Sequence, residues 1–462
     1  MTKDLTQGSP TRLILAFMFP VLVGYLFQQF YTVTDTIIVA KCLGVQALAA
    51  VGATGSVNFL IIGFCMGLTS GFSIPVSQRF GAKDESGLRQ YLYNIIPLCL
   101  LFAAVFTTLT AIFCQQIFQA MLTPGDIIDG AVAYMRILFL GIPFTILYNM
   151  VSAILRALGD SKTPVYFLLL SSVLNIFLDL FLILVIPMGV AGASLATVIS
   201  QAVAGIISLF YMIGHFPILR MRPSERKVQM SKWSVLLYNG VPMGLQYSIT
   251  AIGSVILQTS VNTLGSAAVA SVTAGNRIGM FFCCPYDAMG TTMATYGGQN
   301  TGAGDIPRLR KGLLSCCFIG LCYSVVAFVV LFLFGGKLST LFVDPSQEEL
   351  IRNAHLFLTI QSSFYFPLAL VNIIRFMIQG MGFGVFAILS GVFEMVARAF
   401  DGIVLVPLWG YVAACFASPF AWILADCFLV PAVLHCFRRL QKMLETHAAG
   451  TGTEPPTLSP KP

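Results

Sequence analysis

The sequence predicts an all-α integral membrane protein with twelve transmembrane helices, arranged as two parallel six-helix repeats. Three observations lead to this prediction. Hydrophobic residues make up 57% of the 462 residues, and charged residues only 10%. Apolar runs of about 20 residues, each long enough to cross a bilayer, recur along the chain. A segment of the first half, residues 43–54, returns in the second half as residues 264–275.

The apolar content argues against a soluble fold. A soluble domain with this composition would expose large apolar patches to water. In lipid each backbone polar group must be satisfied within its own segment, so helices are the expected spanning elements. The spans are expected at residues 13–40, 53–77, 92–116, 132–155, 164–186, 190–214, 234–260, 267–296, 313–336, 354–379, 385–407 and 411–437.

An internal repeat relates the two halves of the chain. Residues 43–54 read LGVQALAAVGAT, and residues 264–275, which lie 221 positions later, read LGSAAVASVTAG. Each copy holds six expected spans, so both copies enter the membrane in the same direction and form parallel repeats. In a membrane protein, two such halves indicate a transporter with its site between them. The match continues at the same offset, where Gln78, Gly81, Ala82 and Asp84 correspond to Gln299, Gly302, Ala303 and Asp305.

The repeat divides the chain into two lobes, a connection and a tail. Residues 1–220 are the expected N-terminal six-helix lobe, and residues 234–440 the C-terminal one. The basic residues 221–233 are interpreted as a cytoplasmic linker, and residues 441–462 as a disordered cytoplasmic tail. The first apolar segment is too long for a signal peptide and is expected to remain as the first span.

Basic residues collect in alternate loops and at both ends of the chain, which has a net charge of +7. By the positive-inside rule, both termini are expected in the cytoplasm, with the protein in the cell membrane. This pattern explains the basic charge without nucleic-acid binding. The cysteines and histidines show no metal-ligand spacing, and there is no phosphate-binding loop or catalytic set. No enzyme activity and no cofactor are therefore expected.

Asp35 is the first candidate functional residue, because an ionisable group in the hydrocarbon region costs at least about 2.5 kcal/mol. Tyr31 and Gln28 precede it by four and seven residues and share its helix face. Pro20, earlier in the same helix, removes one backbone hydrogen bond and permits a bend. We therefore expect this helix to change its bend during transport and to carry the carboxylate with it. The alternative is a structural acid near the outer end of the helix.

A second polar group lies in the fifth span, where Asn175 and Asp179 stand four residues apart on one face with Ser171. A hard cation such as sodium prefers several oxygen ligands, which a carboxylate, an amide and hydroxyls can supply. The same carboxylate can instead carry a proton. Asn149 and Thr197, in the neighbouring spans, can complete the shell. The alternative is that the pair joins helices by hydrogen bonds.

In the second half, Arg398 stands where the first half has Asn175. Glu394 and Asp401 flank this arginine four residues before and three after, and either one can neutralise it. One interpretation is a self-paired charge cluster, and the other is that Glu394 and Arg398 line a substrate cavity. Further charges in the expected spans, without an assigned partner, are Arg375, Arg277 and Asp287.

Taken together, these residues resemble the multidrug and toxic compound extrusion (MATE) family over about residues 10–440. The matching motifs are Pro20 fifteen residues before Asp35, the segment 43–54, the loop Gln78-Arg-Phe-Gly81-Ala82-Lys-Asp84 with its repeat at Gln299, the segment Arg156-Ala-Leu-Gly159-Asp160, and Asn175 followed by Asp179. The resemblance implies two six-helix lobes that form a V around a central cavity. It also implies multidrug efflux in exchange for Na+ or H+.

The pattern of acids is similar to the DinF-like branch of the family, in which the coupling site lies in the N-terminal lobe. The second lobe lacks the acids that the NorM-like branch carries in its seventh and tenth spans. Carried over to this sequence, the resemblance implicates Asp35, Asn149, Asn175, Asp179 and Thr197 as cation-coupling residues, with Pro20, Gln28 and Tyr31 in support. Asp35, Asn175 and Asp179 are the metal ligands implied if Na+ is the coupling ion.

We therefore expect a secondary active antiporter that exports small organic compounds by alternating access. It is expected to act as a monomer in the lipid bilayer, with Na+ or H+ as coupling ion. The alternative is a lipid-linked saccharide flippase of the same superfamily, whose more cationic cavity would suit Arg375 and Arg398. Twelve spans and the acids of the first lobe favour the exporter.

Overall fold

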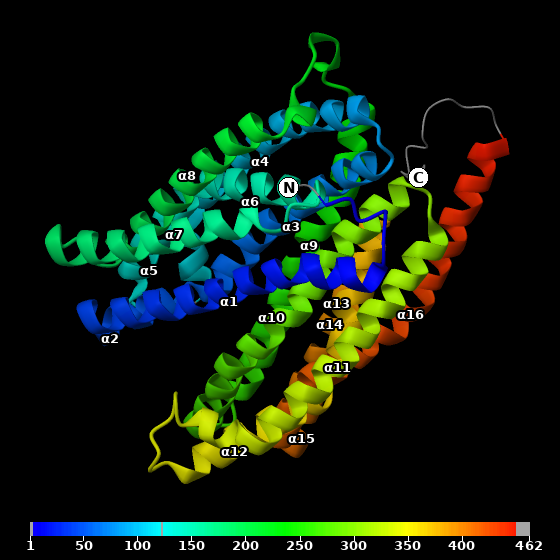
Figure 1. The fold of residues 1–462 in the computed structure, drawn as a ribbon. Helices are drawn as coiled ribbons and strands as arrows, with labels where there is room; N and C mark the ends of the chain where they lie inside the picture. Colours follow the sequence, from blue (N-terminus) through cyan, green and yellow to red (C-terminus); the bar gives the residue numbers. More distant parts are fainter. Residues whose placement is uncertain (1–2, 122, 450–462) are drawn as a thin grey trace. The chain divides into compact units, whose positions relative to one another are not determined.

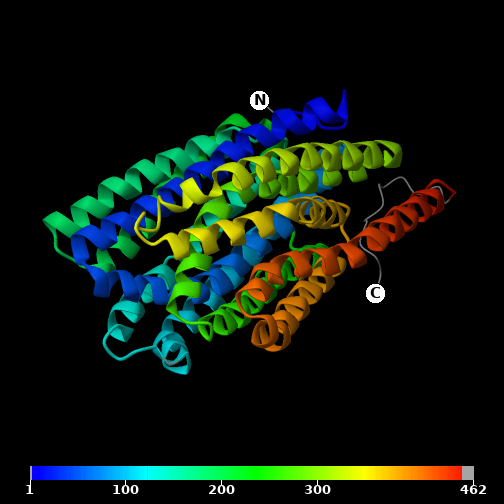
Figure 2. The same cartoon turned by 90° about the horizontal axis from the view of Figure 1, so that it is seen from below.

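A computed structural model describes residues 3–121 and 123–449, and the described residues form helices joined by turns and short loops (Figures 1 and 2). The predicted all-helical class is confirmed. The first half contains α1 (Pro10–Leu43), α2 (Val45–Ala53), α3 (Gly55–Gly81), α4 (Glu85–Ala120), α5 (Ile128–Leu140), α6 (Ile142–Ala157), α7 (Thr163–Leu180), the π-helix η1 (Phe181–Val185) and α8 (Val190–His215). Two short 3-10 helices follow, η2 (Pro217–Leu219) and η3 (Pro223–Glu225).

The second half resembles the first, with α10 in the place of α2 and α3 and with an additional short helix, α15. It contains α9 (Met230–Asn262), α10 (Ser266–Gly302), α11 (Ile306–Ser339), α12 (Glu348–Ser363), α13 (Tyr365–Gly380), α14 (Gly384–Phe400), the π-helix η4 (Asp401–Leu405), α15 (Val406–Trp409) and α16 (Tyr411–Ala449). The expected disordered tail is wrong for residues 441–449, which continue α16. Gln441 donates to Glu445 one turn on, at 3.0 Å, as helical side chains do. Residues 450–462 lie outside the described residues.

Each of the twelve expected spans falls on helical residues, but fewer helices qualify as spans by length and composition. Nine helices of the described chain are long and apolar enough to cross a membrane. Two bent pairs, α5–α6 at 51° and α12–α13 at 50°, raise the number to eleven if each pair is one span. The expected span at 385–407 is divided among α14, η4 and α15.

The two bends occur at corresponding places in the repeats. Pro143 lies in the first turn of α6 and Pro367 in the first turn of α13. A proline is tolerated in the first turn of a helix, because its missing N–H has no intrahelical partner there. It cannot take part in an uninterrupted ladder of hydrogen bonds. Each proline therefore favours a new helix at that point over the continuation of the previous one.

Contacts divide the chain into two compact units at places that differ from the expected lobe boundaries. One unit includes Val23–Gly244, and the other includes Leu5–Leu22 together with the chain from Leu245 onward. The divisions fall inside α1 and inside α9, rather than in the linker at 221–233. Each division follows a proline by two residues, Pro20 in α1 and Pro242 in α9. Proline weakens the helix at both places, since it removes a backbone hydrogen bond.

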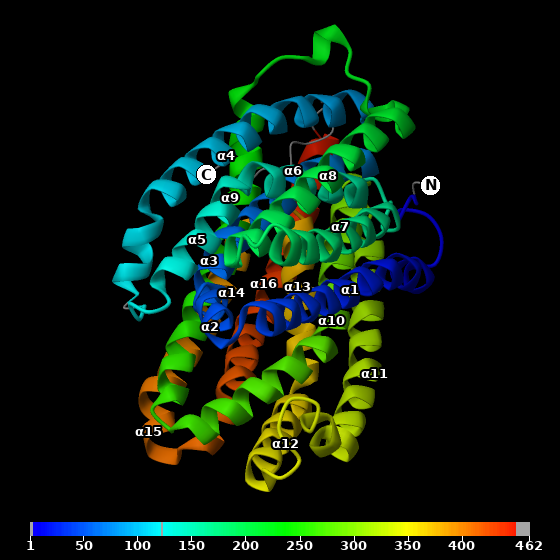
Figure 3. The same ribbon diagram turned by 90° about the vertical axis from the view of Figure 1, so that its left-hand side faces the viewer.

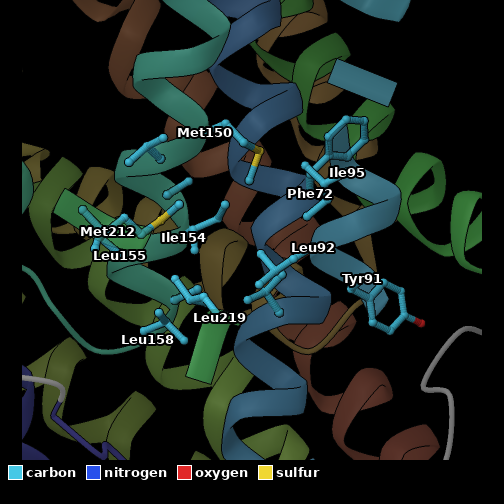
Figure 4. Close-up of a cluster of buried hydrophobic side chains, with 14 of the residues drawn as sticks. Phe72, Tyr91, Leu92, Ile95, Met150, Ile154, Leu155, Leu158, Met212 and Leu219 are labelled. Carbon is cyan, nitrogen blue, oxygen red and sulfur yellow. The ribbon is translucent and has the colours of Figure 1, made fainter. Parts of the chain in front are cut away.

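The first unit has an apolar core between α3, α4, α6 and α8. Phe72, Ile95, Ile154 and Met212 are buried in it, one from each of these helices (Figure 4). Lipid tails are as apolar as these side chains, so burial in a membrane protein is favoured mainly by close van der Waals packing. In the second unit, α13 packs against α10, α11 and α16.

Glycines allow α3 and the start of α9 to pack backbone against backbone. A Cβ atom on Gly71 would lie 2.5 Å from the carbonyl oxygen of Asn239, and one on Gly67 would lie 2.5 Å from that of Met243. Both distances are too short for any larger residue. The spacing of four residues places the two glycines on one helix face, as in other close crossings of membrane helices.

The connection between the repeats is fixed to α4 (Figure 3). Arg89 Nε donates to Glu225 Oε2 at 2.8 Å, and the Asn94 side chain bonds the backbone of Lys227 at 3.0 Å and of Gln229 at 2.8 Å. Glu225 is only 4% exposed. The Arg89 guanidinium, together with the backbone N–H of Arg222, lowers the pKa of Glu225 to about 2. The expected linker is therefore an ordered segment.

The repeat is visible in the backbone as well as in the sequence. Gly44 and Gly265 precede α2 and α10 with φ angles of 85° and 91°, a region that residues with side chains rarely adopt. Asp84 and Asp305 begin α4 and α11, and each accepts a hydrogen bond from the backbone N–H three residues on, at 2.8 and 2.9 Å. The two halves thus share their turn and capping chemistry.

Candidate functional site

Three helices of the first unit bring most of the candidate residues together. Tyr31 and Asp35 come from α1, Asn175 and Asp179 from α7, and Thr197 from α8. Asn175 is 1% exposed, and Asp179 is fully buried. Figure 1 shows α7 and α8 side by side, and these two helices pack against each other. The polar pair predicted from spacing alone is therefore buried inside the unit.

The carboxyl groups of Asp35 and Asp179 lie within hydrogen-bonding reach of each other. Neither Oδ1 atom has a hydrogen-bond partner among the described residues. Two ionised carboxylates at such a distance, shielded from water, repel each other strongly. The pair is favourable only when a proton or a cation lies between the two groups.

The amide of Asn175 fits its surroundings better in one orientation than in the other. With Nδ2 donating to Asp179 Oδ2 at 3.0 Å, its oxygen accepts from the backbone N–H of Thr197 at 3.2 Å. In the reverse orientation Nδ2 donates to Thr197 Oγ1 at 3.3 Å, and the amide oxygen faces the Asp179 carboxyl group. Two acceptors facing each other are unfavourable, so the first orientation is the one that satisfies the amide. Asn175 therefore donates to the carboxyl group of Asp179 and accepts from the backbone of α8.

Hydroxyl groups complete the site. Tyr31 Oη and Thr197 Oγ1 are 3.4 Å apart, and Thr197 Oγ1 also donates to the carbonyl of Ala193 at 3.2 Å. Tyr134 of α5 is a further member that the sequence analysis missed. It is 8% exposed and interacts electrostatically with Asp35 and the other ionisable residues of the site. Tyrosine is common in membrane helices near the interface, so its sequence position gave no signal.

The structure does not join every predicted residue to this group. Asn149 Nδ2 donates to Thr145 O on its own helix, at 2.8 Å. Within residues 3–121 and 123–449, no hydrogen bond links the side chain of Asn149 or Gln28 to the carboxyl pair. Pro20 belongs to the other unit. These three residues are candidates for a supporting role only.

A π-helix begins two residues after Asp179, where α7 passes into η1. A π-helical turn breaks the regular hydrogen-bond ladder and is frequent at functional sites. Among the described residues, no group of three or more His, Cys, Asp or Glu side chains is placed to hold a metal ion. A sodium ion here would need the oxygens of Asn175 and Thr197 in addition to the two carboxyl groups.

The charged residues of the second unit form a buried ion-pair network. Arg375 Nη2 donates to Glu394 Oε1, and Arg398 Nη2 donates to Glu394 Oε2 at 3.1 Å. The three side chains are 3–7% exposed. Glu394 therefore neutralises Arg398, as one of the two flanking acids was expected to do, and it also provides the partner of Arg375. This favours the self-paired cluster, and the cavity-lining role of Glu394 and Arg398 remains a prediction.

The fold and this arrangement of helices define an all-helical membrane protein of the MATE fold. A crystal structure of MATE in complex with MaL6 superimposes with a TM-score of 0.88 at 23% identity, covering 96% of this chain and all of that one. The MatE family model matches residues 20–181 and 242–401. The chain therefore belongs to the MATE family, whose members are transporters and not enzymes.

Two curated relatives extend the comparison. The probable multidrug resistance protein YpnP of Bacillus subtilis is 30% identical over 374 residues, which is 80% of this chain and 82% of that protein. The FAD transporter of Shewanella oneidensis is 24% identical over 343 residues, covering 73% of this chain and 76% of that protein. The two relatives are thus named for different functions.

Proposed function

We propose that this chain is a secondary active antiporter of the DinF-like type, which exports organic, drug-like cations in exchange for Na+ or H+. The observation that carries this proposal is the contact between Asp35 and Asp179 in the first unit. A fully buried acid in contact with a half-buried one is unfavourable without a counter-charge, and membrane proteins tend to keep such groups where they act. The similarity to YpnP, named as a probable multidrug resistance protein, supports the choice of cargo.

The coupling ion binds between the two carboxyl groups. A proton is shared between Asp35 and Asp179, whereas Na+ takes further oxygens from Asn175 and Thr197. Tyr31 holds Thr197 in place through its hydroxyl group. Asn149 and Gln28 support the neighbouring helix faces. Binding of either ion removes the repulsion between the acids and so favours the conformation in which they touch.

Movement is coupled to ion binding through α1. This helix carries Asp35 in the first unit, and its residues up to Leu22 belong to the second unit. Pro20 makes the helix easier to bend just before this division. An ion that draws Asp35 to Asp179 therefore changes the bend of α1. Substrate and ion are coupled because each binds one of two conformations more tightly.

The protein is proposed to work as a monomer in the cell membrane, with both termini in the cytoplasm. Lys and Arg residues gather in the loops on the side of the termini. Substrate export then proceeds from the cytoplasm, against ions that enter from outside. Because one relative is named an FAD transporter, a flavin dinucleotide belongs among the substrates tested beside organic cations.

Transport in inverted vesicles tests this function. A pH gradient and a sodium gradient are imposed separately, and uptake of a fluorescent organic cation and of FAD is followed with the parent protein. Uptake of the cation under one gradient is the expected result, and it identifies the coupling ion. Absence of uptake under both gradients contradicts ion-coupled export of cations. Uptake of FAD but not of the cation would support ion-coupled antiport and contradict the export of organic cations.

A further inference from the structure

Asp401 is a buried acid that the coupling site does not use. It lies at the first position of η4 in the second unit and is fully buried. Neither of its carboxylate oxygens has a hydrogen-bond partner in the described part of the chain. No ion pair of the described residues includes it. An ionised carboxylate in such surroundings is strongly unfavourable, and a neutral carboxylic acid is far less so.

The nearest arginine in the sequence does not neutralise Asp401. Arg398 precedes it by three residues, but its guanidinium bonds a glutamate one turn back in α14. The Arg398 Cδ atom lies 3.6 Å from the place that a Cβ on Gly253 of α9 would take. The η4 backbone instead meets α9 at Ser260, which is seven residues, or about 10 Å, further along that helix. Among the described residues, no ion pair or hydrogen bond joins Arg398 to Asp401.

None of the other described groups around η4 forms an ion pair with Asp401. α14, α15 and α16 pack against η4, and α9 approaches it through Ser260. The titratable and charged groups on these elements near η4 are Arg398 of α14, which shares Glu394 with Arg375, and Tyr411 and Cys415 of α16. Tyr411 Oη donates to the carbonyl of Asn353 at 2.9 Å. The buried Cys415 thiol is the group that interacts electrostatically with Asp401.

A metal cation does not fit this place. Sodium would need several oxygen ligands, as hard cations do. The Ser260 hydroxyl of α9 donates to Ile256 O on its own helix, at 3.2 Å. The adjoining core is apolar and includes Val261, Val406 and Ala414. A proton needs only the carboxylate itself.

We propose that Asp401 is a proton-binding site of the second half, occupied in the conformation described here. The proton stays on the carboxyl group while η4 packs against α9, and it leaves when α9 withdraws and water enters. The repeat places Asp401 within one residue of the position that corresponds to Asp179 in the first half. Two pairs of glycines with positive φ angles align the halves. When Gly159 is aligned with Gly382, Asp179 corresponds to position 402. When Gly189 is aligned with Gly410, it corresponds to position 400. Asp401 lies between these positions.

Gly402 maintains the close packing that keeps the acid dry. A Cβ atom there would lie 2.6 Å from Ser260 Oγ and 3.2 Å from its Cβ. A methyl group at this position requires the Ser260 hydroxyl to rotate and the Ser260 Cβ to shift by a small distance, which loosens the contact of η4 with α9. Substitution Gly402→Ala is therefore expected to admit water and to make Asp401 ionise more readily, without a change in the acid itself.

Infrared spectroscopy of the full chain in lipid vesicles tests the proton directly. The background carries Asp35→Asn, Asp179→Asn, Asp287→Asn and Asp426→Asn, so that protons on the other acids of the spanning helices do not contribute, and the result is independent of the proposed coupling. At neutral pH the carbonyl band of a protonated carboxyl group is expected, and Asp401→Asn should remove it. Asp129→Asn, at an exposed acid of the first unit, serves as the matched control and should leave the band unchanged. A band that persists in Asp401→Asn overturns the proposal.

The second variant keeps the test decisive if Asp401→Asn does not fold. Gly402→Ala should lose the band at lower pH than its parent, and an unchanged titration overturns the role of the packing. The role in transport rests on the proposed function and has its own measurement. Asp401→Asn in the otherwise native chain should flatten the pH dependence of export while export stays driven by the ion gradient. Loss of gradient-driven export in the parent itself would instead contradict the proposed function.

Discussion

At the scale of single residues, the candidate site is a pair of acids that is costly to maintain. Asp35 and Asp179 are in contact, and each has one oxygen without a hydrogen-bond partner in the described chain. A structural acid is normally paired with a donor or a cation. Here the donors are limited to one amide and nearby hydroxyls. The two acids therefore lower the free energy of unfolding, and they provide a site for the ion. A loss of stability of this kind is common at functional sites.

This account predicts that removal of one acid stabilises the protein. Asp179→Asn abolishes the repulsion and keeps the shape of the side chain, so thermal unfolding in detergent without sodium should occur at the same or a higher temperature. Ion-driven transport should fall by more than about tenfold, or about 1.4 kcal/mol in the transport barrier. The control, Asp129→Asn, should change neither. A loss of stability of 2 kcal/mol or more, on the order expected for a broken buried network, would identify Asp179 as a structural acid.

At the scale of helices, two close contacts hold elements of the first unit together. Gly67 and Gly71 let α3 and α9 touch, and Arg89 fixes the connection through Glu225. Both contacts depend on a few atoms. A single substitution in either contact should therefore change the stability of the protein measurably.

Gly71→Ala should destabilise the protein. Its Cβ would lie 2.5 Å from Asn239 O, and overpacking of this kind costs about 1–3 kcal/mol. Gly52→Ala in α2 is the matched control, because nothing lies within 4 Å of its Cβ position. In that exposed helix, alanine should be neutral or stabilise by up to about 1 kcal/mol. Thermal unfolding of both variants in detergent checks the difference, and equal unfolding temperatures would contradict the close crossing.

The Arg89–Glu225 pair should make stability depend on pH in acid solution. The pKa of Glu225 is lowered from its ordinary value of 4.5 to about 2, so the pair contributes fully above pH 4.5 and loses its contribution as the pH falls toward 2. The parent should lose stability across this window more steeply than Arg89→Gln. Glu85→Gln, which removes the 61% exposed partner of the same arginine, should behave like the parent. Parallel pH profiles for all three proteins would show that the pair contributes nothing.

At the scale of the whole molecule, the sequence predicted the helical class, the repeat and the place of most helices. Apolar runs and paired motifs such as Gln78 and Gln299 carry this information locally. The bends, the π-helices and the divisions inside α1 and α9 were not predicted, because they depend on packing between distant segments. Asp35 and Asp179 were predictable because acids are conspicuous in apolar spans. Tyr134 was not, since tyrosine is ordinary there.

The measurement that tests the central claim most directly is ion movement driven by substrate. Liposomes containing the purified protein are loaded with a transported cation, and the internal pH and internal sodium are followed as the substrate leaves. Coupling is reciprocal, so a substrate gradient must move the ion inward if the ion gradient moves the substrate outward. The account predicts entry of H+ or Na+ with the parent and with Asp129→Asn, and none with Asp35→Asn or Asp179→Asn. Equal ion entry with and without the two acids would contradict coupling at this pair.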